Sequence, residues 1–146
     1  MAHNGDVIYF KNNKNFRDAV LNELMILFDK KSNIKLTNNK NKSDKIAVSS
    51  TIDSEAEEII NILINDKTDK LKKLSPIIKD NKKIIIKPLY LYTDEEVLLY
   101  AKLRKLKYKS GKDKKNNLSD FLNKLEQKHP EVKRAIVNSY LGLQKN

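Results

Sequence analysis

The stretch Lys83-Ile84-Ile85-Ile86-Lys87-Pro88-Leu89 carries the strongest strand signal of the chain. Its three successive isoleucines are β-branched and apolar, which is typical of a buried strand. Pro88 has no backbone N–H to give to a neighbouring strand, so it either ends this strand or places it at an edge of the sheet. The elements on both sides are interpreted relative to this strand.

Short apolar runs before this strand alternate with stretches of helical spacing. Further strands are predicted at residues 7–10, 34–37 and 45–50. One helix is predicted from Phe16 to about Lys30. A second helix follows the strand at residues 45–50; it is capped by Asp53 or Ser54 and ends near Ile64. This alternation predicts an α/β fold with right-handed crossovers and a small parallel sheet.

The pattern after the strand is helical. Thr93 and Glu96 form a capping box that opens one helix, and two more helices are predicted at residues 118–128 and 130–143. Residues 66–80 are rich in lysine with weak helical spacing, and no strand is predicted there. We expect a single domain in which residues 1–92 form an α/β core and residues 93–146 form a basic helical region packed on it.

The composition excludes several classes of protein and site. The 146 residues include no cysteine, which excludes a disulfide scaffold, a thiolate zinc site and a Cys-ligated iron–sulfur cluster. Two histidines are too few for a histidine-rich metal site, so no metal site is expected. No apolar run reaches the ~18 residues of a membrane span, and residues 1–5 lack an apolar targeting segment. We therefore expect a cytoplasmic protein without a membrane partner.

The net charge of +11 is concentrated in the second half of the chain. Residues 1–81 carry 14 basic and 12 acidic side chains, whereas residues 82–146 carry 16 basic and 7 acidic ones. Basic clusters with interleaved aromatics are typical of surfaces that bind a phosphate backbone, although a lysine-rich face can also be simply solvated. The predicted nucleic-acid-binding residues are Lys102, Arg104, Lys105, Lys107, Tyr108, Lys109, Lys112, Lys114 and Lys115.

Three segments of the chain carry a distinctive pattern. They are AVSSTIDSEAE at residues 47–57, IKPL at 86–89 followed by EEVLLYA at 95–101, and FLNKLEQKHPEVK at 121–133. Together they resemble the TtuA-like PP-loop ATP pyrophosphatases, which thiolate tRNA and include the cytosolic thiouridylase subunits. In that family the first segment has the form A-x-G-H-N-x-D-D-E-A-E, and the third segment matches the final motif. The resemblance implies a Rossmann-like sheet of the adenine nucleotide alpha hydrolase type, with a C-terminal helical cap, in an N-terminally shortened relative.

The nucleotide-binding signatures of that family are degenerate in this chain. Its S-G-G-K-D-S loop corresponds to residues 11–16, where Asn12, Asn13, Lys14 and Asn15 form a vestigial loop in which both glycines are asparagine. A Cβ at those positions blocks close approach of phosphate, so we expect no ATP binding. The family's cysteines are also absent, so we expect neither an iron–sulfur cluster nor zinc.

The second vestigial motif consists of Ser50, Thr51, Asp53 and Ser54, which have lost the family's His, Asn and second Asp. We interpret Asp53 as a charge that stabilises a helix N-terminus rather than as a metal ligand or catalytic acid, and we expect no catalytic residue. His129, which precedes Pro130, is interpreted as a cap and not as a catalytic residue, because no serine or aspartate constellation is visible around it.

These observations favour a non-catalytic protein related to tRNA 2-thiolation that binds tRNA, a catalytic thiolase subunit, or both. Two alternatives stay open. One is a PP-loop-derived enzyme that binds ATP and acts without cysteine chemistry. The other is a protein-interaction module or homodimer with no RNA role. The conformation of the turn at residues 11–16 discriminates between the non-catalytic protein and the ATP-binding enzyme. An open loop facing a cavity would favour catalysis, and a filled loop would oppose it.

Overall fold

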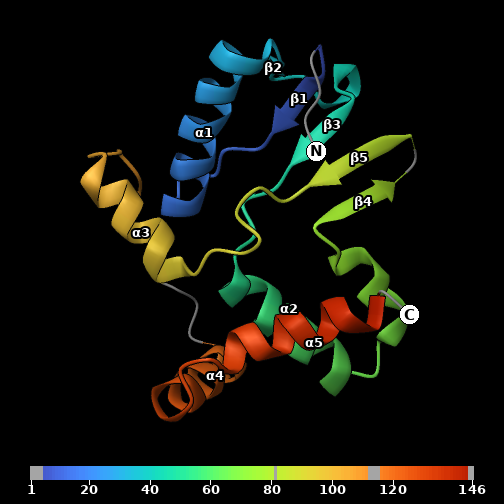
Figure 1. Ribbon diagram of the computed structural model, residues 1–146, viewed down its shortest axis with the longest axis vertical. Helices are drawn as coiled ribbons and strands as arrows, with labels where there is room; N and C mark the ends of the chain where they lie inside the picture. Colours follow the sequence, from blue (N-terminus) through green and yellow to red (C-terminus); the bar gives the residue numbers. More distant parts are fainter. Residues whose placement is uncertain (1–4, 81, 112–115, 145–146) are drawn as a thin grey trace.

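The computed structural model describes residues 5–80, 82–111 and 116–144. Its five-stranded sheet has the order β2-β1-β3-β5-β4, with helices packed around it (Figure 1). The strands are β1 (Val7–Phe10), β2 (Lys35–Thr37), β3 (Lys45–Ala47), β4 (Ile77–Asp80) and β5 (Lys83–Ile86). Neighbours among β2, β1, β3 and β5 are parallel, which confirms the predicted α/β class.

The fifth strand, β4, was not predicted, and it makes the sheet mixed rather than purely parallel. It pairs antiparallel with β5, and Ile77 lies opposite Ile86. The segment gives only a weak strand signal because β4 is a short edge strand, in which Ile77 and Lys79 stay exposed. Since β5 has a neighbour on each side, Pro88 marks the end of β5 and not a sheet edge.

The first four of the described helices begin at side-chain caps. They are α1 (Phe16–Ser32), α2 (Ile52–Ile64), α3 (Asp94–Leu103), α4 (Asn117–Lys128) and α5 (Val132–Gln144), with 3₁₀ segments η1 (Lys40–Lys42) and η2 (Thr68–Leu74). Asn15 caps α1, and the Thr93–Glu96 capping box of α3 is present. The predicted cap of α2 is wrong: Thr51 is the cap, and Ser54 completes its capping box from the third helical position.

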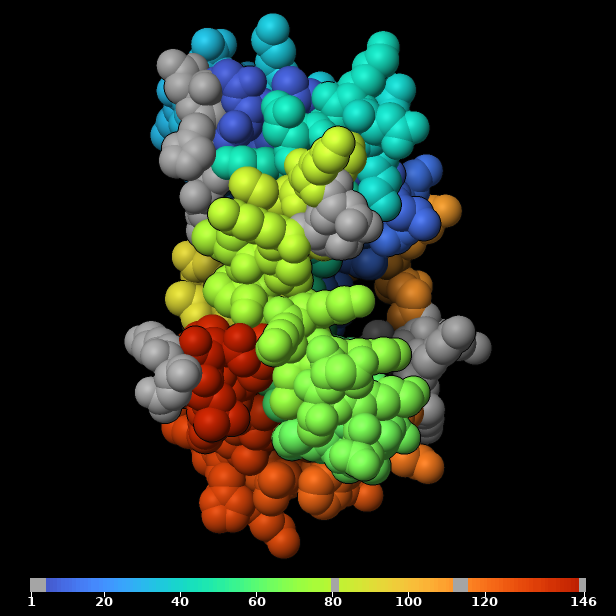
Figure 2. Space-filling view, turned by 90° about the vertical axis from the view of Figure 1, so that its right-hand side faces the viewer, coloured from blue at the N-terminus to red at the C-terminus, as the bar shows by residue number. Residues whose placement is uncertain are grey.

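Two apolar clusters form the core. The first joins the sheet to α1 and α3 through residues such as Ile8, Leu21 and Ala101. The second joins α2 to α5 and includes Tyr90, whose pKa is raised by its burial and by the nearby Glu55 carboxylate. Figure 2 shows η2 and α5 side by side on one face, where the Tyr140 hydroxyl donates a hydrogen bond to the Leu71 carbonyl. Within the described ranges, no helix combines the length and apolar character needed to cross a bilayer.

A buried ion pair connects the end of β5 to α2. Lys87 Nζ lies 2.8 Å from Glu55 Oε1 and donates a second hydrogen bond to the Leu74 carbonyl at 3.2 Å. Both side chains are less than a tenth exposed. A charge this deeply buried is stable only with its partner, so the pair fixes how α2 sits against the sheet.

We predict that Lys87→Met destabilises the protein by about 3–5 kcal/mol, because it leaves the Glu55 carboxylate buried without its partner. Urea denaturation followed by circular dichroism measures the loss. Arg134→Met is the control, since Arg134 and Glu96 form a half-exposed pair at 3.7 Å that contributes at most about 1 kcal/mol. Equal losses in the two variants would contradict a special role for the buried pair.

Candidate nucleic-acid interface

The loops that follow β1 and β3 meet at the carboxyl edge of the sheet. The chain leaves β1 toward β2 on one side, and β3 lies on the other side of β1. In open α/β sheets such a switch point forms the crevice that binds ligands. Residues 11–15 and 48–51 occupy this position, so the structure places both vestigial motifs where a nucleotide site would be.

The loop at residues 11–15 is filled by side chains of the chain itself. The Asn13 amide donates to Asp18 Oδ2 at 2.7 Å, and the Lys14 amide donates to Asn12 Oδ1 at 2.8 Å. Asp18 is 3% exposed, and its other oxygen accepts a hydrogen bond from the Ser49 hydroxyl. A buried carboxylate thus holds one of the loop amides and also joins the loop to the segment after β3.

Lys14 adopts a left-handed backbone conformation with φ of 66°. This region favours glycine, so a lysine here is held by its surroundings. The Lys109 amide donates to the Lys14 carbonyl at 2.7 Å, and Tyr108 packs edge-on against Phe16 with ring centroids 6.3 Å apart. The sequence analysis gives the vestigial loop and the basic segment after α3 as two separate sites. In the structure they form one surface.

A groove of about 470 Å³ lies between this loop, α1 and residues 106–109. Asn12, Lys14, Lys107, Tyr108 and Lys109 from the predicted site residues line it. Its other lining residues, which the sequence analysis did not single out, are Ala19, Asn22, Glu23, Ile26 and Leu106. The signal that could have found the α1 residues is their helical spacing behind the loop.

The remaining predicted basic residues lie beside the groove or outside the described structure. Lys102, Arg104 and Lys105 are exposed at the end of α3, and Arg104 forms an ion pair with Glu23 at 2.9 Å. Lys112, Lys114 and Lys115 lie outside the described residues. The described part of the patch is thus a strip of five cations and Tyr108 that leads from α3 into the groove.

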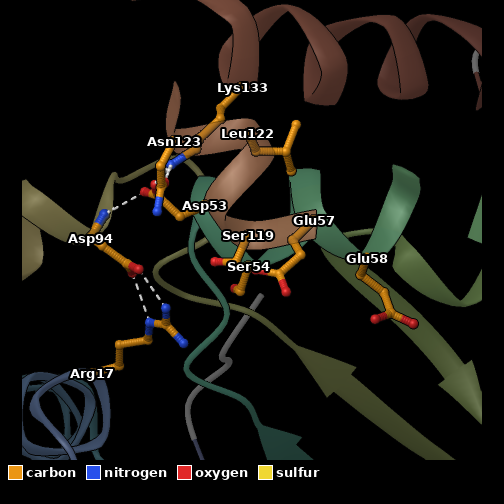
Figure 3. A pocket seen from close by; sticks show the side chains of 10 residues that line it. All are labelled: Arg17, Asp53, Ser54, Glu57, Glu58, Asp94, Ser119, Leu122, Asn123 and Lys133. Carbon is orange, nitrogen blue, oxygen red and sulfur yellow. Dashed lines mark hydrogen bonds and ion pairs between the residues drawn. The ribbon is translucent and has the colours of Figure 1, made fainter. Parts of the chain in front are cut away.

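Residues of the second vestigial motif form hydrogen bonds at the N-termini of α2 and α3. Thr51 caps α2 and donates its hydroxyl to Asp94 Oδ1 at 2.7 Å, while Asp94 also forms a two-point contact with Arg17 (Figure 3). Asp53 Oδ2 accepts from the Asp94 amide at 2.7 Å, at the N-terminus of α3. Ser54 completes the capping box, and Ser50 is half-buried after β3.

Lys133 anchors the last two helices to this network. Its ammonium lies 2.5 Å from Asp53 Oδ1, 2.8 Å from Glu126 and 2.8 Å from Asn123 Oδ1. Burial lowers the pKa of Lys133, but hydrogen bonds to Asp53 and Glu126 outweigh burial and raise it. Lys133 is therefore a cation that holds α5 against α2 and α4. Its place in the P-x-x-K motif is the sequence signal for this role.

The pocket around this network has a volume of about 420 Å³ and is polar (Figure 3). Asp53, Glu57, Glu58 and Asp94 outnumber the cations Arg17 and Lys133. Among the described residues, however, no three His, Cys, Asp or Glu side chains are arranged to hold a metal ion. The geometry is that of a structural ion network at the meeting point of helix N-termini.

Comparison with known proteins connects this fold to tRNA thiolation. No family model matches the chain. The tRNA-5-methyluridine(54) 2-sulfurtransferase of Pyrococcus horikoshii is 33% identical over 110 residues, which are 70% of this chain and 36% of that enzyme. The U34-tRNA thiolase NcsA of Methanococcus maripaludis has a similar structure, with a TM-score of 0.75 and 20% identity, covering 99% of this chain and 73% of NcsA.

The NcsA structure corrects our expectation about cofactors. We expected no iron–sulfur cluster, and this is wrong for the fold, because NcsA carries a [4Fe-4S] cluster. The residues of this chain do not fit such a group, since clusters are held by cysteine thiolates and the sequence has none.

The chain spans about a third of the length of the curated relative that it matches. The matched region includes most of the chain, and the NcsA fold extends over nearly all of it. The fold of the chain thus has a counterpart in NcsA over nearly its whole length. The chain is a relative of the TtuA-like PP-loop proteins of tRNA thiolation.

Proposed function

We propose that this chain is a non-catalytic, cytoplasmic relative of the tRNA thiolation enzymes that binds tRNA. The observation that carries the proposal is the contact between the filled loop and the basic segment, at the Lys109 amide and the Lys14 carbonyl. This contact borders a cationic groove that begins at the loop after β1, one of the two loops of the switch-point crevice. A catalytic thiolase subunit is a second partner in this proposal.

The charge and shape of the groove support RNA as the ligand. Lys14, Lys107 and Lys109 are exposed and line a concave surface. Lysines that neutralise phosphates release counterions, which is the main source of nonspecific affinity for nucleic acids. The proposal thus accounts for the concentration of positive charge in the second half of the chain.

Asp18 supports the absence of catalysis. A triphosphate at the loop would need the Asn13 amide that Asp18 already holds, and it would bring its own negative charge next to a buried carboxylate. Charge repulsion at short range in a poorly hydrated site is costly. The loop is therefore closed to phosphate by a residue of α1.

We predict that Asp18→Ala opens this loop to inorganic phosphate. The substitution leaves the Asn13 amide without its acceptor, which costs about 1–3 kcal/mol of stability. Phosphate should then raise the melting temperature of the variant but not of the wild type. Asp29→Ala, which removes an exposed charge from the same helix, is the control. A phosphate effect of equal size in wild type and Asp18→Ala would show that the loop is not closed by Asp18.

Calorimetry tests the alternative of an ATP-binding enzyme. With ATP and magnesium we expect no binding heat from the wild type, because the loop amides are engaged. Binding heat that disappears in Lys14→Ala would restore the enzymatic alternative.

Filter binding of tRNA at several salt concentrations tests the proposal itself. Replacing Lys107 and Lys109 by alanine should weaken binding and reduce the slope of log K against log salt by about 2, one for each lost phosphate contact. The matched control replaces Lys72 and Lys73, two exposed lysines of η2, and should keep most of the affinity. If both double variants lose affinity equally, or if tRNA binds no better than any polyanion, the proposed RNA site is wrong.

A further inference from the structure

The outer face of α3 carries exposed leucines. The helix lies at the edge of the molecule, with α1 on its inner side (Figure 1). Val97 and Ala101 face inward and are buried, whereas Leu99 and Leu103 on the opposite side are 55% and 73% exposed. Single exposed leucines are ordinary on a protein surface, but these two are four residues apart and so share one side of the helix. They form a short apolar ridge along α3.

An apolar groove lies next to this ridge, between α3 and α1, and has a volume of about 300 Å³. Its lining comes from both helices and includes Val20, Leu24, Val97 and Tyr100. Among the described residues that line it, Glu96 alone is charged, although the chain contains 30 lysines and arginines. A ridge beside a groove is a shape that can complement a second copy of itself, as a two-fold interface requires.

The charges on α3 indicate which partner fits this face. Glu95 stands one turn before Leu99, Lys102 stands one turn after it, and both are exposed. They are seven positions apart, about 10 Å along the helix axis, which is too far for a direct ion pair. No ion pair within the described part of the chain involves either of them. An acid before the leucine and a base after it make the helix complementary to an antiparallel copy of itself.

We propose that two copies of this chain associate through the outer face of α3, around a two-fold axis that passes near Leu99. The two α3 helices then run antiparallel, and Leu99 contacts the partner's Leu99. Glu95 lies opposite the partner's Lys102, and the two-fold axis generates this ion pair twice. Leu103 packs at the end of the partner's groove that Tyr92 lines. This inference goes beyond the proposed function, because the contact involves no RNA.

The net charge of +11 opposes the association of two copies, so the attraction has to be local. At 0.15 M ionic strength, exposed charges more than about 8 Å apart are largely screened from each other, whereas charges in direct contact still interact. The leucines then supply most of the affinity, and the two ion pairs fix the antiparallel orientation. We therefore expect a dimer at physiological salt that weakens at low salt, where the long-range repulsion is stronger.

Sedimentation equilibrium over a dilution series at 0.15 M salt tests this inference. The wild type should dimerise, and Leu99→Glu should stay monomeric, because the substitution places two carboxylates together at the two-fold axis. Leu99 is more than half exposed, so the variant should keep its fold, which circular dichroism verifies.

Charge reversal tests the antiparallel arrangement itself. Glu95→Lys and Lys102→Glu should each raise the dissociation constant of the dimer about tenfold, because each places like charges opposite each other twice. An equimolar mixture of these two variants should recover the dimer, since both contacts in the mixed pair again join an acid to a base. Asp69→Lys, which makes the same charge change at an exposed position of η2, is the control and should leave the dissociation constant unchanged.

A wild type that is monomeric at every concentration would overturn this inference, and the face would then be available to a different partner. A dimer that persists in Leu99→Glu would also overturn it, because the copies would then associate through another surface. So would a mixture of Glu95→Lys and Lys102→Glu that dimerises no better than either variant alone. None of these measurements contains RNA, so their outcome is independent of the proposed tRNA site.

Discussion

The carboxylate of Asp18 determines what the carboxyl edge of the sheet can do. It is buried at the start of α1, holds the Asn13 amide and accepts from Ser49, so that one side chain closes the loop after β1 and joins it to the segment after β3. Loop amides arranged in this way bind anions, and here the anion belongs to the protein. The left-handed backbone at Lys14 keeps the loop in the shape that allows this contact.

The C-terminal helices are held to the core in two different ways. The helix α3 packs in the first apolar cluster through Val97 and Ala101, whereas α5 packs in the second cluster and through the Lys133 network. The residues that connect these two arrangements include the basic segment after α3. The groove lies within the first of these arrangements, because Leu106 and Tyr108 pack against the first apolar cluster and the Lys109 amide bonds to the Lys14 carbonyl.

Much of the fold could be predicted because its signals are local. The Ile84–Ile86 run and the Thr93 capping box each depend on a few neighbouring residues. The strand β4 could not be predicted, because its four residues follow a lysine-rich stretch and form a strand through pairing with β5 rather than through a pattern of their own. The candidate site was harder to predict from the sequence than the fold. Asp18 reads as an ordinary acid in the first turn of a helix, and only the three-dimensional fold places Lys14 beside Lys109 and Glu23 beside the same groove.

Part of the lysine excess lies on the two edge strands of the sheet, where it has a different effect. The strands β2 and β4 each have one neighbour, and each carries an exposed lysine, Lys35 and Lys79. An unpaired strand edge can pair with a strand of another molecule. A charged side chain at the edge makes such edge-to-edge pairing unfavourable. Some of the positive charge thus opposes pairing between the sheet edges of neighbouring copies of the molecule.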